Sequence, residues 1–300
     1  MLKIAHGAWY AHPLPDGHRF PMLKYELIPE QLIREGTCAA ENFFEPGELD
    51  EKWILAVHEE AYWNDLKTLN LSPRMVRRIG FPLTAELVHR ETTIAQGTIT
   101  CCHHALADGV SLNVAGGTHH AFPDRGEGFC LLNDVGIAAD YLLSQGLARR
   151  ILVIDLDVHQ GNGTAVMFQS EPRVFTFSVH GRDNYPLRKE ISDLDIALPT
   201  GTPDQGYLTI VAETLPTLFQ KHQPDFVFYV AGVDILKTDK LGHLALSREG
   251  CQQRDRLVLE QCQRSGVPLV VTMGGGYSAR LADVVEAHCN TFRLVQTMFF

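Results

Sequence analysis

The sequence has no long hydrophobic run, no apolar stretch in its first residues and no ordered set of cysteines. No apolar run approaches the ~20 residues that a membrane-spanning helix requires. The first ten residues, MLKIAHGAWY, contain no long apolar stretch of the kind that signal peptides carry. The seven cysteines are an odd number without regular spacing, which favours reduced thiols over a disulfide framework. We therefore expect a cytoplasmic protein that does not enter a membrane.

Basic residues are also scarce relative to acidic ones. The chain has 26 Lys and Arg against 36 Asp and Glu, and its formal net charge is −10. Because nucleic-acid-binding proteins need a basic face, we expect no direct nucleic-acid binding. An acidic surface instead favours cationic substrates such as lysine side chains or polyamines, although charge sign alone discriminates weakly.

Short β-branched and aromatic runs alternate with longer helical patterns along the chain, which is typical of an α/β protein with a parallel sheet. The clearest predicted strands are Ile151–Asp155, Val174–Val179, Asp225–Val230 and Pro268–Thr272, with weaker ones at 2–5 and 111–114. Helices are predicted at 29–35, 50–68, 84–107, 131–145, 204–221 and 247–265. We expect one domain over residues 1–300, with a mostly parallel central sheet covered by helices on both faces.

Polar groups follow the four clear strands, where ligands collect in open parallel sheets. Asp155, Asp157 and His159 stand at alternate positions, so an extended segment would point all three to one side. Asp234 follows a neighbouring predicted strand and could complete a site of two carboxylates and one imidazole. Such a set suits Zn²⁺ or Fe²⁺ with one position left open for water. The alternative is that these aspartates only cap loops or helices.

Two pairs of adjacent histidines occur in the chain. His119 and His120 follow two glycines after a predicted strand, and histidines in such a loop can transfer protons near neutral pH. His103 and His104, which follow Cys101 and Cys102, fall within a predicted helix. Adjacent residues on a helix point about 100° apart, so we expect ordinary helix residues rather than a metal site there.

Four motifs in order resemble the histone deacetylase family, whose members have the arginase–deacetylase fold. They are GGTHHAFPDRGEGFCLLND, DLDVHQGNGT, AGVD and GGGY, and the similarity extends from about residue 5 to residue 290. Asn162 stands in HQGNG, where most members have aspartate, and this resembles the class IV branch and its bacterial relatives.

The resemblance implies a role for each motif residue. Asp157, His159 and Asp234 match the zinc ligands; His119 and His120 match the tandem catalytic histidines; Asp155 and Asn162 match their respective partners; and Tyr277 matches the tyrosine that polarises the substrate carbonyl. By the same resemblance, Gly128 and Phe129 line an acyl-lysine tunnel, Gly275 brings backbone close to the substrate, and Arg19 lies in an internal cavity.

Potassium sites are implied as well. One would use carbonyls of Asp155, Asp157, His159 and Val179 with the Ser178 hydroxyl, and a second would lie near Phe168, Val174 and Tyr207.

The implied activity is zinc-dependent hydrolysis of the amide bond in acyl-lysine, within a protein or peptide. An acetylpolyamine amidohydrolase is the alternative enzyme, and it would act on an acylated small amine. Long-chain acyl groups are as plausible as acetyl. A non-catalytic acyl-lysine or metal-binding module is a third hypothesis, although a binding module has no need of the histidine pair and Tyr277. By resemblance, His120 is the main proton shuttle and His119 is mainly electrostatic.

Overall fold

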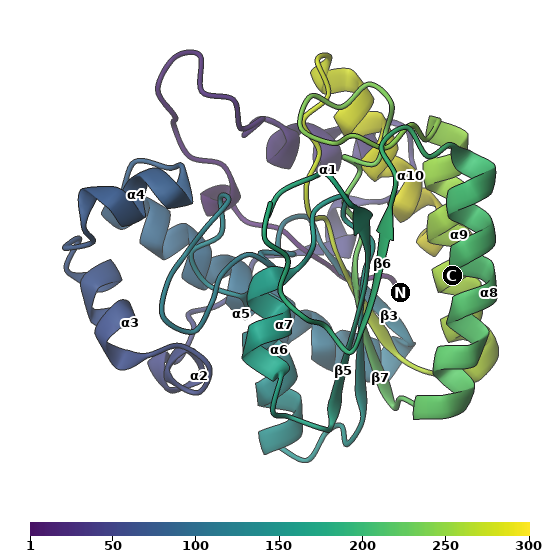
Figure 1. Cartoon of the computed structure of the whole chain (residues 1–300), viewed down its shortest axis with the longest axis horizontal. Coiled ribbons are helices and arrows are strands. Elements are labelled where there is room, and N and C mark those ends of the chain that lie inside the picture. The colour runs from purple at the N-terminus through teal and green to yellow at the C-terminus, as the bar shows by residue number, and fades with distance from the viewer.

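One eight-stranded parallel sheet forms the centre of the computed structural model, which describes all 300 residues (Figure 1). The strand order is β2-β1-β3-β8-β7-β4-β5-β6, and every neighbouring pair is parallel. The strands are β1 Ile4–Ala5, β2 Phe43–Phe44, β3 Val110–Asn113, β4 Ile151–Asp155, β5 Val174–Gly181, β6 Leu194–Leu198, β7 Phe226–Val230 and β8 Leu269–Thr272.

Helices cover both faces of this sheet, which gives three layers. They are α1 Lys24–Arg34, α2 Glu51–Leu55, α3 Glu60–Lys67, α4 Pro73–Ile79, α5 Ala85–Asp108, α6 Asp134–Ser144, α7 Asn162–Phe168, α8 Asp204–His222, α9 Arg248–Ser265 and α10 Leu281–Phe299. In Figure 1, α8, α9 and α10 lie on one side of the sheet and α5, α6 and α7 on the other, with α2, α3 and α4 farther out. The predicted α/β fold is therefore confirmed.

The central strands are apolar on both sides because both sides are covered. Every residue of β3, β4, β7 and β8 is buried, as expected for a parallel sheet between helix layers. Strand β6 at the edge is short and mostly half-buried, and Asp195 interrupts its apolar run. This weak pattern explains why it was not predicted from the sequence.

The predicted helix at 50–68 is wrong, because the segment forms two helices, α2 and α3. Between them the buried His58 leaves the helical path, and its Nδ1 lies 2.9 Å from the Phe122 carbonyl oxygen. Its Nε2 accepts a hydrogen bond from the Asn133 amide at 3.0 Å. Two long-range hydrogen bonds to a buried ring thus override the local helical pattern.

The other differences are at ends and in missed elements. Helix α1 begins at Lys24 rather than at residue 29, and α6 begins at Asp134 rather than at residue 131. Helices α4, α7 and α10 were not predicted, nor were the two-residue strand β2 and the edge strand β6. The remaining predicted strands and helices agree with the structure to within about two residues, which is the usual uncertainty of element ends.

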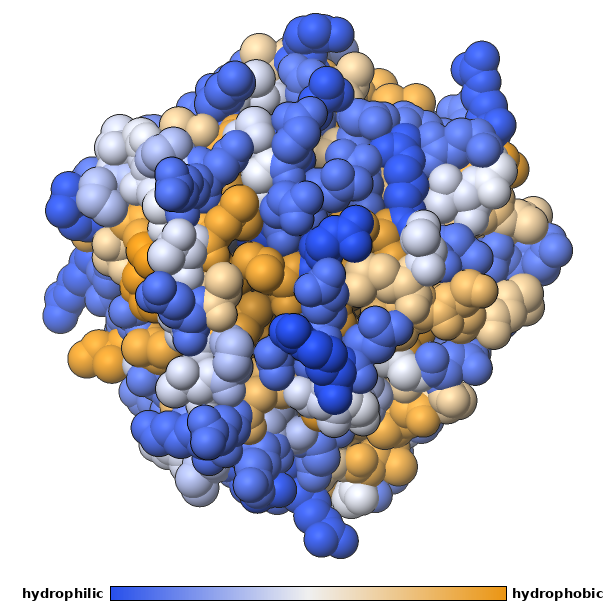
Figure 2. All heavy atoms as spheres, turned by 90° about the vertical axis from the view of Figure 1, so that its right-hand side faces the viewer, coloured by the Kyte–Doolittle hydropathy of each residue, from blue (hydrophilic) through white to orange (hydrophobic).

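The outer surface is mixed in character. Figure 2 shows the face formed by the α8 and α9 side, where hydrophilic residues predominate and hydrophobic ones form a band across the middle. No helix is both long enough and apolar enough to cross a membrane. All seven cysteines are buried and unpaired.

Candidate metal centre and active site

Three possible metal ligands converge at the carboxyl ends of two paired strands. Asp157 and His159 lie in the loop after β4, and Asp234 lies in the loop after its neighbour β7. One ligand atom from each residue lies within 4.8 Å of the other two, and all three residues are buried. The structure thus brings together the residues that the sequence nominated as ligands.

Backbone amides hold both carboxylates in place. The Val158 amide donates to Asp234 Oδ1 at 2.9 Å, and the Gly275 amide donates to Asp157 Oδ2 at 2.7 Å. Asp234 Oδ2 is buried without a well-aligned hydrogen bond, although His159 Nδ1 lies 3.2 Å from it. A buried carboxylate oxygen that lacks a donor is costly unless a cation neutralises it, so this set of residues fits a divalent metal ion.

Only glycine fits at position 275. A Cβ there would lie 2.1 Å from Asp234 Oδ2 and 2.9 Å from Asp157 Oδ2. The absence of a side chain therefore lets the backbone approach both carboxylates, as the GGGY motif predicted.

The charges at these three residues also fit a cation. Burial and the neighbouring Asp157 carboxylate raise the pKa of Asp234 to about 7. Burial alone would lower the pKa of His159, but the Asp157 and Asp234 carboxylates beside its Nδ1 outweigh burial and raise the pKa to about 10. Without an ion, Asp234 and His159 thus favour holding protons, and a bound divalent metal would replace those protons.

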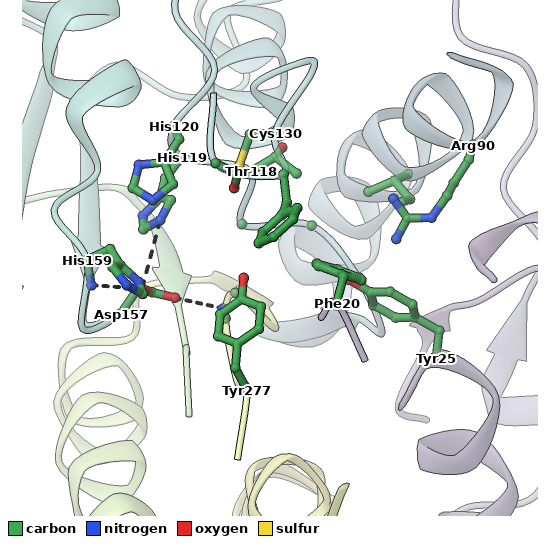
Figure 3. Close-up of a pocket in the computed structure, with 17 residues that line it drawn as sticks. Phe20, Tyr25, Arg90, Thr118, His119, His120, Cys130, Asp157, His159 and Tyr277 are labelled. Carbon is green, nitrogen blue, oxygen red and sulfur yellow. Dashed lines mark hydrogen bonds and ion pairs between the residues drawn. The ribbon is translucent and has the colours of Figure 1, made fainter. Parts of the chain in front are cut away.

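The tandem histidines lie beside the candidate metal ligands Asp157 and His159 (Figure 3), and each histidine has its own hydrogen-bond partner. His119 Nδ1 lies 2.6 Å from Asp155 Oδ2, and His120 Nδ1 lies 2.6 Å from Asn162 Oδ1. Since the two oxygens accept hydrogen bonds, each imidazole carries a proton on Nδ1, and its Nε2 is not used by that partner. The His119 Nε2 is 3.9 Å from Asp157 Oδ1, so it faces the metal site.

These partners separate the proton affinities of the two rings. Burial lowers the pKa of His119, but the Asp155 and Asp157 carboxylates outweigh burial and raise it to about 9. Burial and the adjacent His119 hold the pKa of His120 well below its usual value, and the Asn162 hydrogen bond opposes this only weakly. The site therefore contains one imidazole that favours the charged form and one that favours the neutral form.

Tyr277 completes the group of polar side chains. Its ring centroid is 6.5 Å from that of His159, and Figure 3 shows its hydroxyl directed toward the site. Burial raises the pKa of Tyr277 well above its usual value, so the hydroxyl stays protonated and can donate. Asp239, which the sequence did not nominate, orients the loop by accepting from the Tyr277 amide at 2.5 Å.

Gly128 and Phe129, which the sequence nominated for a substrate tunnel, lie with Tyr185 in the wall of one cavity at the entrance of the site. The entrance is a cavity of about 440 Å³, and both Phe129 and Tyr185 belong to its wall. The Tyr185 ring stands edge-on to His120 at 5.0 Å between centroids. Its hydroxyl donates to the buried carboxylate of Glu127. Phe129 has a φ of 68°, an unusual conformation that often marks functional positions.

Arg19 does not lie in an internal cavity, so that prediction is wrong. Its side chain is exposed at the entrance, and its Cζ lies 5.0 Å from the centre of the Phe129 ring. The small inner cavity of about 40 Å³ instead contains Arg90, which belongs to α5. Arg90 Nε donates to the Tyr10 carbonyl at 2.7 Å. Arg19 lies on the loop before α1. The path of this loop past Phe129 depends on tertiary packing, which the local sequence does not determine.

A buried arginine of α9 was also missed by the sequence reasoning. Arg254 is fully buried and donates to the carbonyls of Leu156 at 3.0 Å and Gly232 at 2.8 Å. Those carbonyls lie in the two loops that carry the metal-ligand candidates. Its Nε pairs with Asp255 at 2.8 Å. An arginine inside a polar helical sequence gave no signal of this contact.

The potassium candidates are adjacent in the sheet. Asp155 of β4 pairs in register with Ser178 of β5, and Val179 follows it. Ser178 Oγ lies 2.9 Å from His180 Nδ1. Near the second implied site, the Tyr207 hydroxyl is 3.5 Å from the Leu156 carbonyl oxygen.

The other histidine pair belongs to a helix, as expected. Cys101 Sγ and Cys102 Sγ lie in the interior near the carbonyls of Leu112 and Thr98. His103 is exposed and contacts Tyr141, so these side chains point in different directions.

Comparison with known proteins identifies similar sequences and structures. The sequence-family model of the histone deacetylase domain matches residues 18–292. An uncharacterized protein of Picosynechococcus is 45% identical, with 97% of both chains covered. Histone deacetylase 2 of Arabidopsis thaliana is 30% identical over 90% of this chain and 73% of its own. The crystal structure of a histone deacetylase homolog complexed with SAHA superimposes with a TM-score of 0.83 at 22% identity, covering 99% of this chain and 83% of that one.

Proposed function

This chain belongs to the histone deacetylase family, and we propose that it is a zinc-dependent hydrolase that releases the acyl group from acyl-lysine in proteins or peptides. Family membership supports hydrolytic deacetylation, and the arginase–deacetylase fold accompanies it. The observation that carries the finer proposal is the cluster of Asp157, His159 and Asp234 within 4.8 Å beside a buried pair of histidines and Tyr277.

Zinc is the metal that we propose, with Fe²⁺ as the alternative. Two carboxylates and one imidazole with an open position suit either ion. When bound, the ion supplies Lewis acidity, which polarises the amide carbonyl and acidifies the attacking water.

The side chains of the site would divide the remaining work. Tyr277 would donate its hydroxyl proton in a hydrogen bond to the oxygen of the reacting carbonyl as negative charge develops there. His120, neutral at its free Nε2, would take the proton of the water. His119, held charged by Asp155, would stabilise the negative charge, and a protonated imidazole would deliver a proton to the leaving amine. Asp155 and Asn162 would orient the two rings.

The entrance supports a long, uncharged side chain as substrate. Phe129, Tyr185 and the backbone of Gly128 line it, and acylation removes the charge that a lysine would otherwise carry past these rings. Gly275 would approach the substrate with its backbone. Polyamines are less well suited, because the guanidinium of Arg19 lies at the same entrance without an ion-pair partner and would repel a polycation.

A potassium ion and a cytoplasmic location also belong to the proposed function. Potassium would bind near Asp155, Ser178 and Val179, where it would brace the loop that carries Asp157 and His159. The seven unpaired thiols suit a reducing compartment such as the cytoplasm.

A substrate panel tests the proposed activity. Purified protein is given lysine peptides with acetyl, decanoyl or myristoyl groups, and acetylpolyamines, before and after metal removal and zinc re-addition. We expect peptide hydrolysis that is lost with the metal and recovered with zinc. His120→Ala should lower kcat by ~10²–10⁴-fold, whereas His103→Ala, in the other histidine pair, should not. Hydrolysis of polyamines alone, or activity that survives metal removal, would contradict the proposal.

A further inference from the structure

The entrance of the site is cationic, although the chain as a whole is acidic. Eleven residues line this cavity, and none of them carries a carboxylate. Two arginines and three histidines line it, together with two tyrosines: Arg19, Arg78, His120, His159, His243, Tyr185 and Tyr277. The formal net charge of the whole chain is −10. The charge at the entrance is therefore opposite to the one that the composition suggested for the substrate-binding surface.

One of the two arginines has its charge balanced within the protein. Arg78 lies 2.6 Å from a carboxylate oxygen of Glu127, whose side chain is 2% exposed. The same carboxylate accepts from Arg125 Nε at 2.8 Å, and Arg125 also pairs with Asp124. Glu127 further accepts from the Tyr185 hydroxyl. This cluster has two arginines and two carboxylates, so it fixes the wall of the entrance without leaving a free charge.

Arg19 is different, because it forms no ion pair or side-chain hydrogen bond. Its guanidinium lies over the Phe129 ring, with Cζ 5.0 Å from the centroid. Phe129 is itself held by Phe20 and Phe81, each 5.1 Å away between centroids, and its amide donates to the Ile79 carbonyl at 2.7 Å. Stacking on a fixed ring keeps the guanidinium in place while its N–H donors stay available.

An acyl-lysine substrate would bring its backbone to this position. If the acyl group reaches the metal site, the lysine stem passes Phe129 and its α-carbon lies near the entrance, within reach of Arg19. Acylation has removed the lysine charge, so an electrostatic partner for Arg19 has to come from groups close to that α-carbon. A carboxylate fits best, because a guanidinium binds it through two parallel hydrogen bonds.

Building on the proposed function, we propose that Arg19 selects substrates in which a carboxylate lies next to the acylated lysine. The carboxylate can be an acidic side chain that flanks the lysine in a peptide, or the α-carboxylate of a free Nε-acyl-lysine. Basic flanking residues are disfavoured at the same place. Arg19 thus sets specificity and takes no part in bond cleavage.

Matched peptides test this selection. The acyl-lysine, with the acyl group hydrolysed fastest in the panel above, is flanked by Glu, by Gln or by Lys, and kcat/KM is measured at low and high salt. We expect the Glu peptide to exceed the Gln peptide by about two- to fivefold at low salt, the range of an exposed ion pair. The preference should shrink at high salt, because exposed charges are screened.

Variants assign the preference to one side chain. Arg19→Gln should bring the Glu-to-Gln ratio to about one, since an exposed ion pair carries the whole effect. Arg34→Gln should keep the wild-type ratio, because Arg34 is an exposed arginine of α1 outside the entrance. Arg19→Lys keeps the positive charge but loses the paired N–H donors of the guanidinium, so part of the preference for the Glu peptide should remain. A second pair of substrates, free Nε-acyl-lysine and its α-amide, shows whether the carboxylate belongs to the amino acid itself or to a neighbour.

Each result decides the matter. Equal kcat/KM for the Glu and Gln peptides together with equal values for the acid and amide, or a preference that persists in Arg19→Gln, overturns the role of Arg19 while leaving the hydrolase activity intact. Failure to release acid from any of these substrates with zinc present overturns the proposed function itself, and this inference with it.

Discussion

The base of the site and its entrance are held together by different forces. At the base, backbone amides and carbonyls hold the buried carboxylates and Arg254, and the side chains of Asp155 and Asn162 hold the two histidines. At the entrance, packed aromatic rings support Phe129, and the unpaired charge of Arg19 faces solvent. Changes at the base should therefore affect every substrate or the folded state, whereas changes at the entrance should affect only the choice of substrate.

The largest effect is expected from removing a metal ligand. Asp157→Ala, His159→Ala or Asp234→Ala should each lose the bound zinc and abolish hydrolysis, because two remaining ligands hold the ion weakly. Elemental analysis of the purified variants measures the metal, and peptide turnover measures the activity. Full zinc occupancy in Asp234→Ala would remove this residue from the site.

Arg254 should matter most for stability. Arg254→Met leaves the buried Asp255 carboxylate without its cation and removes the guanidinium donor from the Leu156 and Gly232 carbonyls. Breaking a buried ion pair costs about 3–5 kcal/mol, so the free energy of unfolding should fall by that amount in a denaturant titration of the metal-free protein.

The matched control for this change is on the same helix. Arg256→Met removes a half-exposed arginine whose ion-pair partner, Glu260, is 4.0 Å away, and it should change stability by less than about 1 kcal/mol. Equal effects of the two variants would show that the buried contacts of Arg254 do not brace the base.

Tyr277→Phe should reduce the rate without loosening the base. Loss of one donor to the developing negative charge costs ~10²–10³ in kcat, while zinc content and stability should remain as in the wild type. Steady-state kinetics and elemental analysis test both points. An effect confined to KM would mean that the tyrosine only binds substrate.

The smallest effect at the base should come from Asn162→Asp. An aspartate 2.6 Å from His120 Nδ1, where Asn162 Oδ1 now lies, would favour the charged imidazole and raise its pKa, by about 1–3 units for so close a charge. In the wild type the pKa of His120 is depressed by burial, so the ring is neutral and able to act as a base at low pH. In the variant, the acidic limb of the kcat/KM profile should move to higher pH.

An unmoved profile would separate the two possible roles of Asn162. If zinc content is unchanged and the limb stays in place, Asn162 serves only the turn in the Gly-Asn-Gly segment, where asparagine is common. This experiment therefore shows whether Asn162 sets the proton affinity of His120 or only stabilises the loop.

Most of the sheet could be predicted from the chain alone. Strands β4, β5, β7 and β8 are short apolar runs, and such runs indicate strands buried on both faces. The helical pattern at 50–68 failed because His58 forms two distant hydrogen bonds. Strand β6 escaped detection because an edge strand is only half-buried, which weakens its hydrophobic signal.

The motif residues of the base could also be nominated in advance. Asp157 and His159 are near neighbours in the chain, and Asp234 follows a strand whose carboxyl end had to reach the same edge of a parallel sheet. In contrast, the contact of Arg254 with Leu156 spans 98 residues, and that of Tyr185 with Glu127 spans 58. Arg19 lies outside the inner cavity because it packs on Phe129, which is also distant in the chain. Local patterns in the sequence determine the strands and the residues at their ends. The packing of distant helices and loops determines that Arg254 braces the bottom of the site and that Arg19 faces its entrance.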